Sequence, residues 1–529
     1  MNKEYKTTIG LEVHAELKTK TKMFCNCRNN PDEIKPNFNI CPVCMAHPGT
    51  LPVINKQAVK NVLKVGLALN GHLADFTEFD RKNYFYPDIP KGYQISQYKY
   101  PLVSGGVLNG VEITRVHLEE DTASSTHNGN SSLINYNRAG VPLMELVTEP
   151  VIETAKQAGD FARELQLLLR YLGVSDANME KGEMRVEANI SVSQTDELGT
   201  KVEIKNLNSF KVVEKAVDYE VKRQIKALEK GEKILQETRG WDENKGSTFS
   251  QRIKEGSDDY RYFPDPDLPK LKLSEIPEFS EEELRKEIPE LPQEKRKRYS
   301  ENYGIKGEDI ESYILNDDLA ELFEAVVSNF RDKEIIKLAS NYLTSDLVGL
   351  MKLDRRAEAP SFAKAEGKRE DEGRLDCHAE ARRDGTTDFA KQNPSLRACP
   401  PWRGTCDVAV QKKRYNNLGK IEAQSFVELI SLVKEEKISS RGAKDILAIM
   451  YKKGGMAKNI AQVENLYQKS DEGELQKIIE QVIKENPLVF EEYKNGKEAV
   501  LGFLVGQAMK ISGGSSNPQK ISDLFKKSV

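Results

Sequence analysis

The 529-residue sequence lacks the features of a membrane-spanning or secreted protein. Its longest apolar stretch, from Ala499 to Met509, is much shorter than the ~20 residues that a helix needs to cross a bilayer. The first residues, Met1 to Tyr5, do not resemble a signal or transit peptide. The seven cysteines are an odd number and four are clustered, which argues against a disulfide scaffold and predicts a reduced, cytoplasmic environment.

Common motifs of nucleotide-binding and hydrolytic enzymes are missing as well. The chain has no Gly-x-x-x-x-Gly-Lys-Ser/Thr loop, no Gly-x-Gly-x-x-Gly after a strand and no Gly-x-Ser-x-Gly turn. A bound nucleotide would therefore occupy an uncommon type of site. The net charge of −4 gives no general attraction to nucleic acid, so any RNA contact must come from local basic patches.

The hydrophobic pattern predicts an α+β domain followed by helical domains. A chain of this length is expected to form roughly two to four domains. Residues 1–292 alternate β-rich runs with a few strong helices and no regular βαβ order, which predicts a largely antiparallel sheet. Residues 293–352 and 415–436 predict a helical domain, and 437–529 predict a small helical C-terminal domain.

Helical periodicity and capping residues predict helices from Asn55 to Gly71, from Thr154 to Gly173 and after Ser209. The Pro- and Glu-rich segment from Asp265 to Pro292 predicts the linker that leaves the first domain. Strands are predicted at 110–118, 132–137, 184–192 and 200–204. Further helices are predicted at 422–436, 440–452 and 499–511.

Residues 353–414 differ in style from the rest of the chain. Nine Arg and five Lys lie in 355–414, whereas 415–529 holds sixteen Lys and the single Arg441. With its lost hydrophobic periodicity, this contrast predicts a disordered or loosely ordered insertion. Four of its residues fit no common zinc spacing, and we expect them to be incidental rather than a second zinc site: Cys377, His378, Cys399 and Cys406.

Two close cysteine pairs stand near the N-terminus. Cys25 and Cys27 are separated by thirteen residues from Cys41 and Cys44. Paired thiolates of this kind suit tetrahedral zinc, and four sulfurs leave no open position, so the predicted role is structural. The alternative is four free or redox-active thiols in a buried loop.

A carboxylate and an imidazole project from one face of an apolar, strand-like run, because Glu12 and His14 are two residues apart. More polar side chains follow on other predicted strands: His117, Glu119, Glu120, Asp121, Glu145 and Glu149. So many carboxylates need a cation, and oxygen ligands with one imidazole suit Mg²⁺ or Mn²⁺ better than zinc. The alternative is a half-buried pair that only stabilises a strand.

Cations also stand beside aromatic residues and side-chain amides at 80–97 and at 252–263. Such mixtures are suited to phosphate oxygens and to stacking of a base or ribose. The alternative is a solvated turn around a small aromatic core.

With these motifs in place, residues 5–350 and 415–529 closely resemble the B subunit of the bacterial glutamyl-tRNA(Gln)/aspartyl-tRNA(Asn) amidotransferase. The resemblance rests on long strings in the same order: IGLEVH (9–14), CPVC (41–44), FDRKNYFYPD (79–88), GYQISQ (92–97), HLEED (117–121), NRAGVPLMELVTEP (137–150), EIKNLNSF (203–210), QETR (236–239), DYRYFPDPDLP (259–269) and GFLVGQAMK (502–510).

The resemblance implies a cradle-shaped catalytic domain, a helical domain and a small tail domain. It also implies a two-step reaction on misacylated tRNA. The side-chain carboxylate of the tRNA-bound Glu or Asp is first phosphorylated by ATP, and ammonia then displaces the phosphate. The ammonia would come through a channel from a separate glutaminase (amidase) subunit, and a third, small subunit would complete a heterotrimer.

Residue roles follow from the resemblance by matching position. Mg²⁺ coordination is implied for Glu12, His14, Glu120 and Glu145. Lys82 would contact the transferred phosphate, and the nucleotide or the tRNA acceptor end would meet Asn83, Asn206, Ser209 and Arg252. Glu187 and Glu203 would hold a second cation or guide ammonium. Basic residues of the tail would bind tRNA phosphates: Lys452, Lys453, Lys458, Lys494, Lys497 and Lys510.

Two positions depart from the family pattern. Glu187 stands where the family commonly has Asp, and Thr122-Ala123-Ser124 follows HLEED where the family tends to have Ala-Gly-Lys. The first change places that ligand role in doubt, and the second removes a cation. Other interpretations are an archaeal-type paralogue serving Glu-tRNA(Gln) alone and a non-catalytic, zinc-containing tRNA-binding relative.

Overall fold

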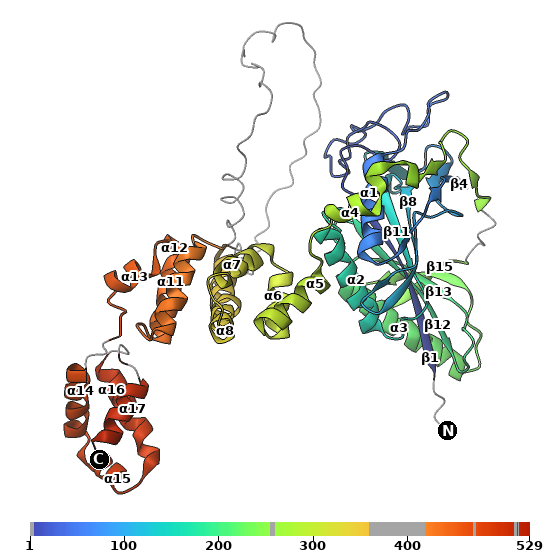
Figure 1. Ribbon diagram of the computed structural model, residues 1–529. Helices are drawn as coiled ribbons and strands as arrows, with labels where there is room; N and C mark the ends of the chain where they lie inside the picture. The colour runs from blue at the N-terminus through green and yellow to red at the C-terminus, as the bar shows by residue number, and fades with distance from the viewer. Residues whose placement is uncertain are drawn as a thin grey trace, which may run out of the picture. The chain divides into compact units, whose positions relative to one another are not determined.

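The computed structural model divides the chain into two units, Met1–Lys295 and Arg296–Val529. It describes residues 5–253, 260–358, 418–468, 472–512, 516 and 518–528 (Figure 1). The backbone alone is described for 206, 252, 253, 355–358, 472 and 474.

A ten-stranded sheet forms the centre of the first unit. Its strands are β1 (Lys6–Glu16), β2 (His72–Leu73), β6 (Val103–Ser104), β7 (Val107–Leu108), β8 (Val111–Glu120), β11 (Pro142–Thr148), β12 (Met184–Ser193), β13 (Val202–Leu207), β14 (Glu237–Asp242) and β15 (Ser247–Ile253). They lie in the order β15-β14-β13-β12-β1-β11-β8-β6-β2, with β7 beside β8. Every pairing is antiparallel except β13 with β14, so the predicted, largely antiparallel sheet is confirmed.

The central strand β1 separates an apolar face from a polar one. Ile9, Leu11 and Val13 are fully buried in the core, whereas Glu12 and His14 alternate with them on the opposite face. This alternation follows from the two-residue period of a strand, and it keeps the apolar core apart from the polar side chains.

Three helices cover the apolar face: α1 (Lys56–Ala68), α2 (Ala155–Tyr171) and α3 (Phe210–Glu229) (Figure 1). Each begins after a residue whose side chain accepts a hydrogen bond from the first turn, as predicted for Asn55, Thr154 and Ser209. All three predicted helices are therefore confirmed.

Three smaller sheets accompany the main sheet. One consists of β4 (Asp80–Asn83), β5 (Tyr93–Ser96) and β16 (Phe263–Pro264), and another is the hairpin β9 (Ser124–Asn128) and β10 (Ser131–Asn135). A third pairs β3 (Phe76–Thr77) with β17 (Leu271–Lys272). Their strands are too short for a clear hydrophobic period, so the sequence does not reveal most of them.

The predicted linker from Asp265 to Pro292 is wrong as a description of most of this segment. Leu273, Phe279 and Leu284 are buried in the same core as α1 and α2. Short 3-10 turns and the helix α4 (Glu281–Lys286) carry these side chains, and α4 packs against α1. Turns this short show no sustained hydrophobic periodicity in the sequence. The linker was therefore predicted from the Pro and Glu content alone.

The second unit is helical, as predicted. Its helices are α6 (Gly307–Ile314), α7 (Asp317–Val327), α8 (Lys333–Asn341), α9 (Val348–Glu358), α11 (Ala423–Lys434), α12 (Ser440–Lys453), α13 (Ala457–Val463), α14 (Glu472–Glu485), α15 (Pro487–Lys494), α16 (Leu501–Ile511) and α17 (Pro518–Lys527), and α5 (Pro292–Arg298) lies at the boundary. The last four helices share a core of their own that includes Ile479, Leu504 and Phe525. Among the described helices, none is both long and apolar enough to span a membrane.

The predicted insertion begins inside a helix, because α9 continues to Glu358. The prediction of disorder from residue 353 is therefore wrong for its first residues. Residues 359–417 lie outside the described residues, and with them Cys377, His378, Cys399 and Cys406.

Replacing Phe161 of α2 by alanine should lower the free energy of unfolding of the first unit by about 3–5 kcal/mol, because its ring is fully buried. Phe85 is 84% exposed, so Phe85→Ala is the matched control and should change the free energy by less than about 0.5 kcal/mol. Urea unfolding followed by Trp241 fluorescence, in a Trp402→Phe background, measures both. Equal losses would contradict this core assignment.

Candidate functional site

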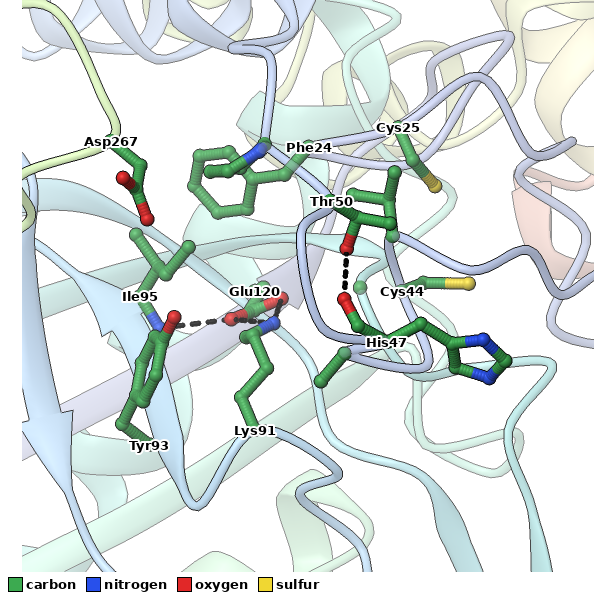
Figure 2. Close-up of a pocket in the computed structure, with 14 residues that line it drawn as sticks. Phe24, Cys25, Cys44, His47, Thr50, Lys91, Tyr93, Ile95, Glu120 and Asp267 are labelled. Carbon is green, nitrogen blue, oxygen red and sulfur yellow. Dashed lines mark hydrogen bonds and ion pairs between the residues drawn. The ribbon is translucent and has the colours of Figure 1, made fainter.

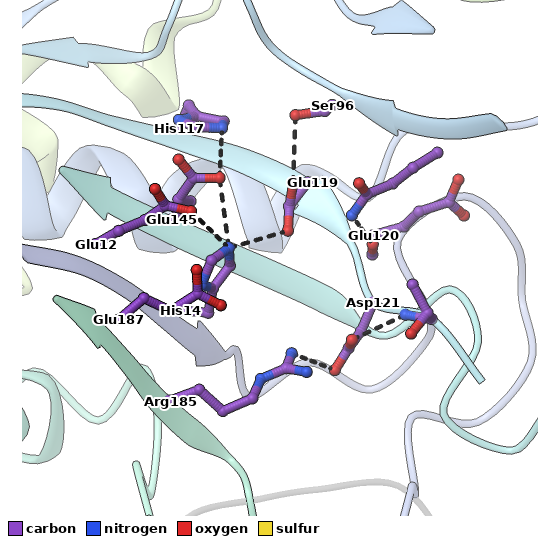
Figure 3. A network of polar contacts seen from close by, with 12 residues as sticks. Glu12, His14, Ser96, His117, Glu119, Glu120, Asp121, Glu145, Arg185 and Glu187 are labelled. Atoms are coloured by element: carbon purple, nitrogen blue, oxygen red, sulfur yellow. Dashed lines mark hydrogen bonds and ion pairs between the residues drawn. The ribbon is translucent and has the colours of Figure 1, made fainter. Parts of the chain in front are cut away.

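The strand register gathers acidic and imidazole side chains from five neighbouring strands on the polar face of the sheet (Figure 3). On β1, Glu12 lies opposite Glu187 of β12, and His14 lies opposite Glu145 of β11. Glu145 in turn lies opposite His117 of β8. Three groups have ligand atoms within 4.8 Å of one another: Glu12, His14 and Glu145; His117, Glu119 and Glu145; Glu12, Glu187 and Glu203.

His14 is the centre of the first group. Its Nε2 atom lies 3.4 Å from Glu145, 3.6 Å from Glu119 and 3.9 Å from Glu12. Burial by itself lowers the pKa of His14, but its hydrogen bond to Glu145 and the charges of Glu145 and Glu119 raise that pKa to about 9. The cluster thus attracts positive charge to the point where these carboxylates converge.

Two other pKa shifts show how the carboxylates and imidazoles of this cluster act on one another. Burial, followed by repulsion from Glu145 and Glu187, raises the pKa of Glu12 to about 7. Burial also opposes ionisation of Glu145, but the charge of His117 and hydrogen bonds from His117 and His14 hold the pKa of Glu145 well below its usual range. Carboxylates this close and this buried coexist more easily around a divalent cation, and their oxygens suit Mg²⁺.

The third group, Glu12 with Glu187 and Glu203, extends the cluster across β12 to β13. Lys205 approaches Glu187 at 2.7 Å, and the hydroxyl of Thr238 donates to Glu203 at 2.7 Å. Glu12 belongs to this group as well as to the first, so the two form one continuous acidic surface.

Glu120 does not join this cluster. It follows Glu119 on β8 and projects from the opposite side, where its carboxylate accepts hydrogen bonds from Lys91 at 2.6 Å and from the Ile95 backbone at 2.9 Å (Figure 2). Glu119 takes the expected place beside His14 instead. The predicted grouping of Glu120 with Glu12, His14 and Glu145 is therefore corrected, with Glu119 in its place.

A cavity of about 190 Å³ lies on the Glu120 side of β8 (Figure 2). Lys91, Tyr93 and Glu120 line one part of it. Cys44 and His47 line another part, and both belong to the loop that carries the four cysteines, residues 25–47, here called the cysteine loop. The Lys91–Glu120 ion pair thus borders the same cavity as the cysteine loop.

Lys82 of β4 faces the carboxylates. Burial disfavours its charged form, but the charges of Glu119 and Glu145 raise the pKa of Lys82 far above its usual range. Its ammonium also lies 5.0 Å from the centre of the Tyr260 ring. A permanent cation beside the acidic cluster is suited to contact phosphate oxygens.

The side chains expected to bind a nucleotide are more scattered. Asn83 donates to the backbone carbonyls of Tyr260 and Arg261, at 3.2 and 2.8 Å, and so connects β4 to that segment. Ser209 accepts a hydrogen bond from the Val212 backbone and caps α3. The side chains of Asn206 and Arg252 lie outside the part of the chain that the structure describes.

The four cysteines converge in one place. Cys44 Sγ lies 4.0 Å from Cys27 Sγ and 3.9 Å from Cys41 Sγ, and Cys25 belongs to the same group. A tetrahedron with Zn–S bonds of ~2.3 Å separates its sulfurs by roughly 3.8 Å, so the arrangement fits zinc closely. A hydrogen bond from Cys25 lowers the pKa of Cys44 to about 5, which favours the thiolate form.

All six lysines expected to contact tRNA are exposed. Two of them face carboxylates: Lys458 lies 3.7 Å from Glu428, and Lys497 lies 2.9 Å from Glu492. Lys494 lies over the ring of Phe490. Solvent-exposed ion pairs of this kind are weak, so the two paired lysines stay accessible to phosphate.

Glu119 and His117 are the residues of the cluster that sequence reasoning left without a role. A signal for both is present, because His117 and Glu119 are two residues apart and must share a strand face, which excludes Glu120. Knowing which face is the polar one required the pairing of β8 with β11.

Family comparisons define the class of protein. Residues 7–277 match the GatB/GatE catalytic domain, and residues 406–529 match the GatB domain that follows it in this family. The catalytic match contains every member of the carboxylate cluster and all four cysteines.

Three relatives carry the same name, the B subunit of aspartyl/glutamyl-tRNA(Asn/Gln) amidotransferase. The relative from Caldanaerobacter subterraneus is 41% identical over 537 residues, covering 99% of this chain and 99% of its own. Those from Moorella thermoacetica and Crocosphaera subtropica are 40% and 39% identical, cover 99% of this chain, and are themselves covered to 99% and 97%. The chain therefore belongs to the family of these amidotransferase B subunits. This confirms the predicted enzyme class, a ligase that forms carbon–nitrogen bonds with glutamine as amide donor.

Replacing Ser209 by alanine should lower the free energy of unfolding by about 1 kcal/mol, because α3 loses its cap. Ser209→Asp restores an acceptor and should recover that stability. Urea unfolding of both variants makes the comparison. Unchanged stability in Ser209→Ala would contradict the role of this hydroxyl as the cap of α3.

Replacing Cys44 by serine should reduce the zinc content of the purified chain from about one ion to nearly none, because three thiolates hold zinc much less tightly than four. Metal analysis by mass spectrometry measures the change. Cys399→Ser, outside the described residues, is the matched control and should leave the zinc content unchanged. Zinc loss in Cys399→Ser alone would show that Cys399 binds the zinc and that Cys44 does not.

Proposed function

We propose that this chain is the kinase and transamidase component that converts Glu-tRNA(Gln), Asp-tRNA(Asn) or both to the amidated forms. Its relatives are named for both tRNAs, and one observation supports this chemistry above all: the carboxylate and imidazole cluster with Lys82 beside it.

In the first step, the side-chain carboxylate of the tRNA-bound amino acid attacks the γ-phosphorus of ATP. A new carboxyl O–P bond forms, the bond to the β-phosphate oxygen breaks, and ADP leaves. In the second step, ammonia attacks the acyl carbon, loses a proton, and phosphate departs with the electron pair of the C–O bond. Both steps spread negative charge, so catalysis depends on cations held in place.

Glu12, His14, Glu119 and Glu145 would hold Mg²⁺, which supplies charge neutralisation at the phosphates when bound. His14 must then be neutral, so binding of the cation displaces the proton that the carboxylates stabilise. Lys82 would contact the transferred phosphoryl group from β4. Glu120 would pair with Lys91 and form part of the wall of the neighbouring cavity.

Glu187 and Glu203 would serve a second cation or an incoming ammonium ion. Their proximity to Glu12 supports this assignment, since each of those cations would reduce repulsion among the three carboxylates. An ammonium ion must lose a proton to become ammonia before it can attack, and a nearby carboxylate is a suitable acceptor of that proton.

The remaining assignments follow from the family. Structural zinc would be bound by Cys25, Cys27, Cys41 and Cys44, and ATP would meet Asn83, Asn206, Ser209 and Arg252. A glutaminase subunit would supply ammonia, and a small third subunit would complete a cytoplasmic heterotrimer. The exposed tail lysines would contact the tRNA backbone, which makes affinity depend on salt. The cradle shape of the catalytic domain and the domain limits at 292 and 436 belong to this proposal.

The test is phosphate transfer from γ-labelled ATP with Glu-tRNA(Gln) or Asp-tRNA(Asn) and ammonia, using the chain co-expressed with its glutaminase and small partner subunits. Formation of ADP and amidated tRNA in equal amounts would support the proposal and identify the tRNA. Tight tRNA binding without ADP would overturn it in favour of the non-catalytic binding protein.

Glu119→Gln should raise the Mg²⁺ concentration needed for half-maximal ADP formation and lower the rate on the order of a hundredfold, because a carboxylate ligand is lost. Glu120→Gln is the matched control: its carboxylate faces Lys91, so the Mg²⁺ dependence should stay as in the unchanged protein. The same assay across a Mg²⁺ titration separates the two. A shifted Mg²⁺ dependence in Glu120→Gln alone would return Glu120 to the metal site.

A further inference from the structure

The arm between the two cysteine pairs, residues 28–40, gains little from burial. Ile34 is 94% exposed and Phe38 is 56% exposed, and of the arm's large apolar side chains only Ile40 is half-buried, so they anchor the arm weakly. An arm of thirteen residues with such weak anchors has many conformations, and ordering it costs free energy. Something other than a hydrophobic core must position the two cysteine pairs relative to each other.

The side chain of Asn137 provides four such contacts, in addition to those that Asp32 makes with Lys181 and Asn37 makes with Ile134. It is fully buried, and it makes four hydrogen bonds to the backbone of the arm. Its Oδ1 atom accepts from the N–H groups of Phe38 and Asn39 at 2.8 and 2.9 Å. Its Nδ2 atom donates to the carbonyls of Glu33 and Lys35 at 3.3 and 2.9 Å. One amide is thus paired with four backbone groups from about one hundred residues earlier in the chain.

Two neighbouring asparagines support the same contact. Asn135 accepts from the Asn37 backbone at 3.1 Å and from the Asn137 backbone at 3.1 Å. Asn37 in turn accepts from the Tyr136 backbone at 2.7 Å. Asn37 has a φ of 56°, a left-handed conformation that asparagine tolerates better than most residues.

The segment that carries Asn137 also reaches the candidate catalytic strand. Three residues later, the N–H of Gly140 donates to the carbonyl of Asp121 at 2.9 Å, just beyond the end of β8. The carbonyl of Gly140 accepts from Met23 at 2.7 Å, two residues before the first cysteine. The residues from Asn137 to Gly140 therefore contact Met23, which precedes the cysteine loop, and the 28–40 arm in its middle.

We infer that Asn137 is a positioning residue of the four-cysteine site, and that it holds the 28–40 arm so that the two cysteine pairs already face each other before metal binds. The inference rests on the structural zinc included in the proposed function. A preorganised site saves the entropy of ordering the arm during metal binding, so the loss of Asn137 weakens affinity without changing the ligands.

Three variants test this role in the full-length chain. Asn137→Ala removes all four hydrogen bonds, and Asn137→Asp keeps the acceptor oxygen but loses both donors. Asn130→Ala is the matched control, because Asn130 is an exposed asparagine in the turn between β9 and β10.

The first readout is hydrogen exchange of residues 33–39 in the metal-free chain. Asn137→Ala should accelerate exchange of the Phe38 and Asn39 amides by roughly tenfold or more, since these two N–H groups lose the oxygen that accepts from them. Exchange in β1 and α2 should stay unchanged, which excludes general unfolding as the cause. Asn137→Asp should be intermediate, and Asn130→Ala should match the unchanged chain.

The second readout is metal affinity, measured by competition with a chelator for Zn²⁺ and by the thiolate absorption of bound Co²⁺. Asn137→Ala should bind Zn²⁺ about ten- to a hundredfold more weakly, yet give the same Co²⁺ spectrum at saturation because the four sulfurs are intact. If Asn137→Ala changed neither the Zn²⁺ affinity nor the hydrogen exchange of the arm, the positioning role of Asn137 would be refuted, while the zinc site itself would stand. Failure of the unmodified chain to bind either metal would refute the structural zinc, and the metal role of Asn137 with it.

Discussion

The pairing of β1 with β11 on one side and β12 on the other is the constraint on which the candidate site depends. It places Glu12 beside Glu187 and His14 beside Glu145, and a shift of β1 by one residue would turn Glu12 and His14 into the apolar core. Because Ile9, Leu11 and Val13 must stay buried, the hydrophobic core enforces the register. The same pattern that folds the sheet therefore assembles the charged cluster.

The assembled cluster is electrostatically unfavourable by itself. The pKa of His14 is raised, which favours its charged form, and the pKa of Glu12 is raised, which favours its neutral form. Bound protons thus reduce the negative charge that a metal cation would otherwise neutralise. Lys82 and Lys205 add fixed positive charges at two edges. A site in which charge is balanced only partly by the protein is well suited to a reaction that brings in metal, polyphosphate and ammonium.

Glu120 and Lys91 line a cavity together with the cysteine loop, whereas Glu119 joins the carboxylate cluster. This division explains how neighbouring residues of one motif, Glu119 and Glu120, have different surroundings. Asn137 makes four hydrogen bonds to the backbone of the loop, whereas the cluster is carried on the central strands. A surface loop and the central sheet thus meet at the end of β8.

Much of the fold was predictable from local patterns. The helices capped by Asn55, Thr154 and Ser209 were found because caps and the 3.6-residue period are local signals. The segment from Asp265 to Pro292 was misread because its buried side chains lie on short turns. The four cysteines were grouped correctly from spacing alone, since they are close in sequence.

The sequence by itself determined the family, the strand and helix types, and the residue kinds available for chemistry. It could not decide between Glu119 and Glu120, because both belong to one motif and only the pairing of β8 with β11 shows which one faces His14. Nor could it reveal that Asn137 holds an arm a hundred residues away. Such contacts join segments that are distant in the chain, and their geometry exists only once the sheet has formed.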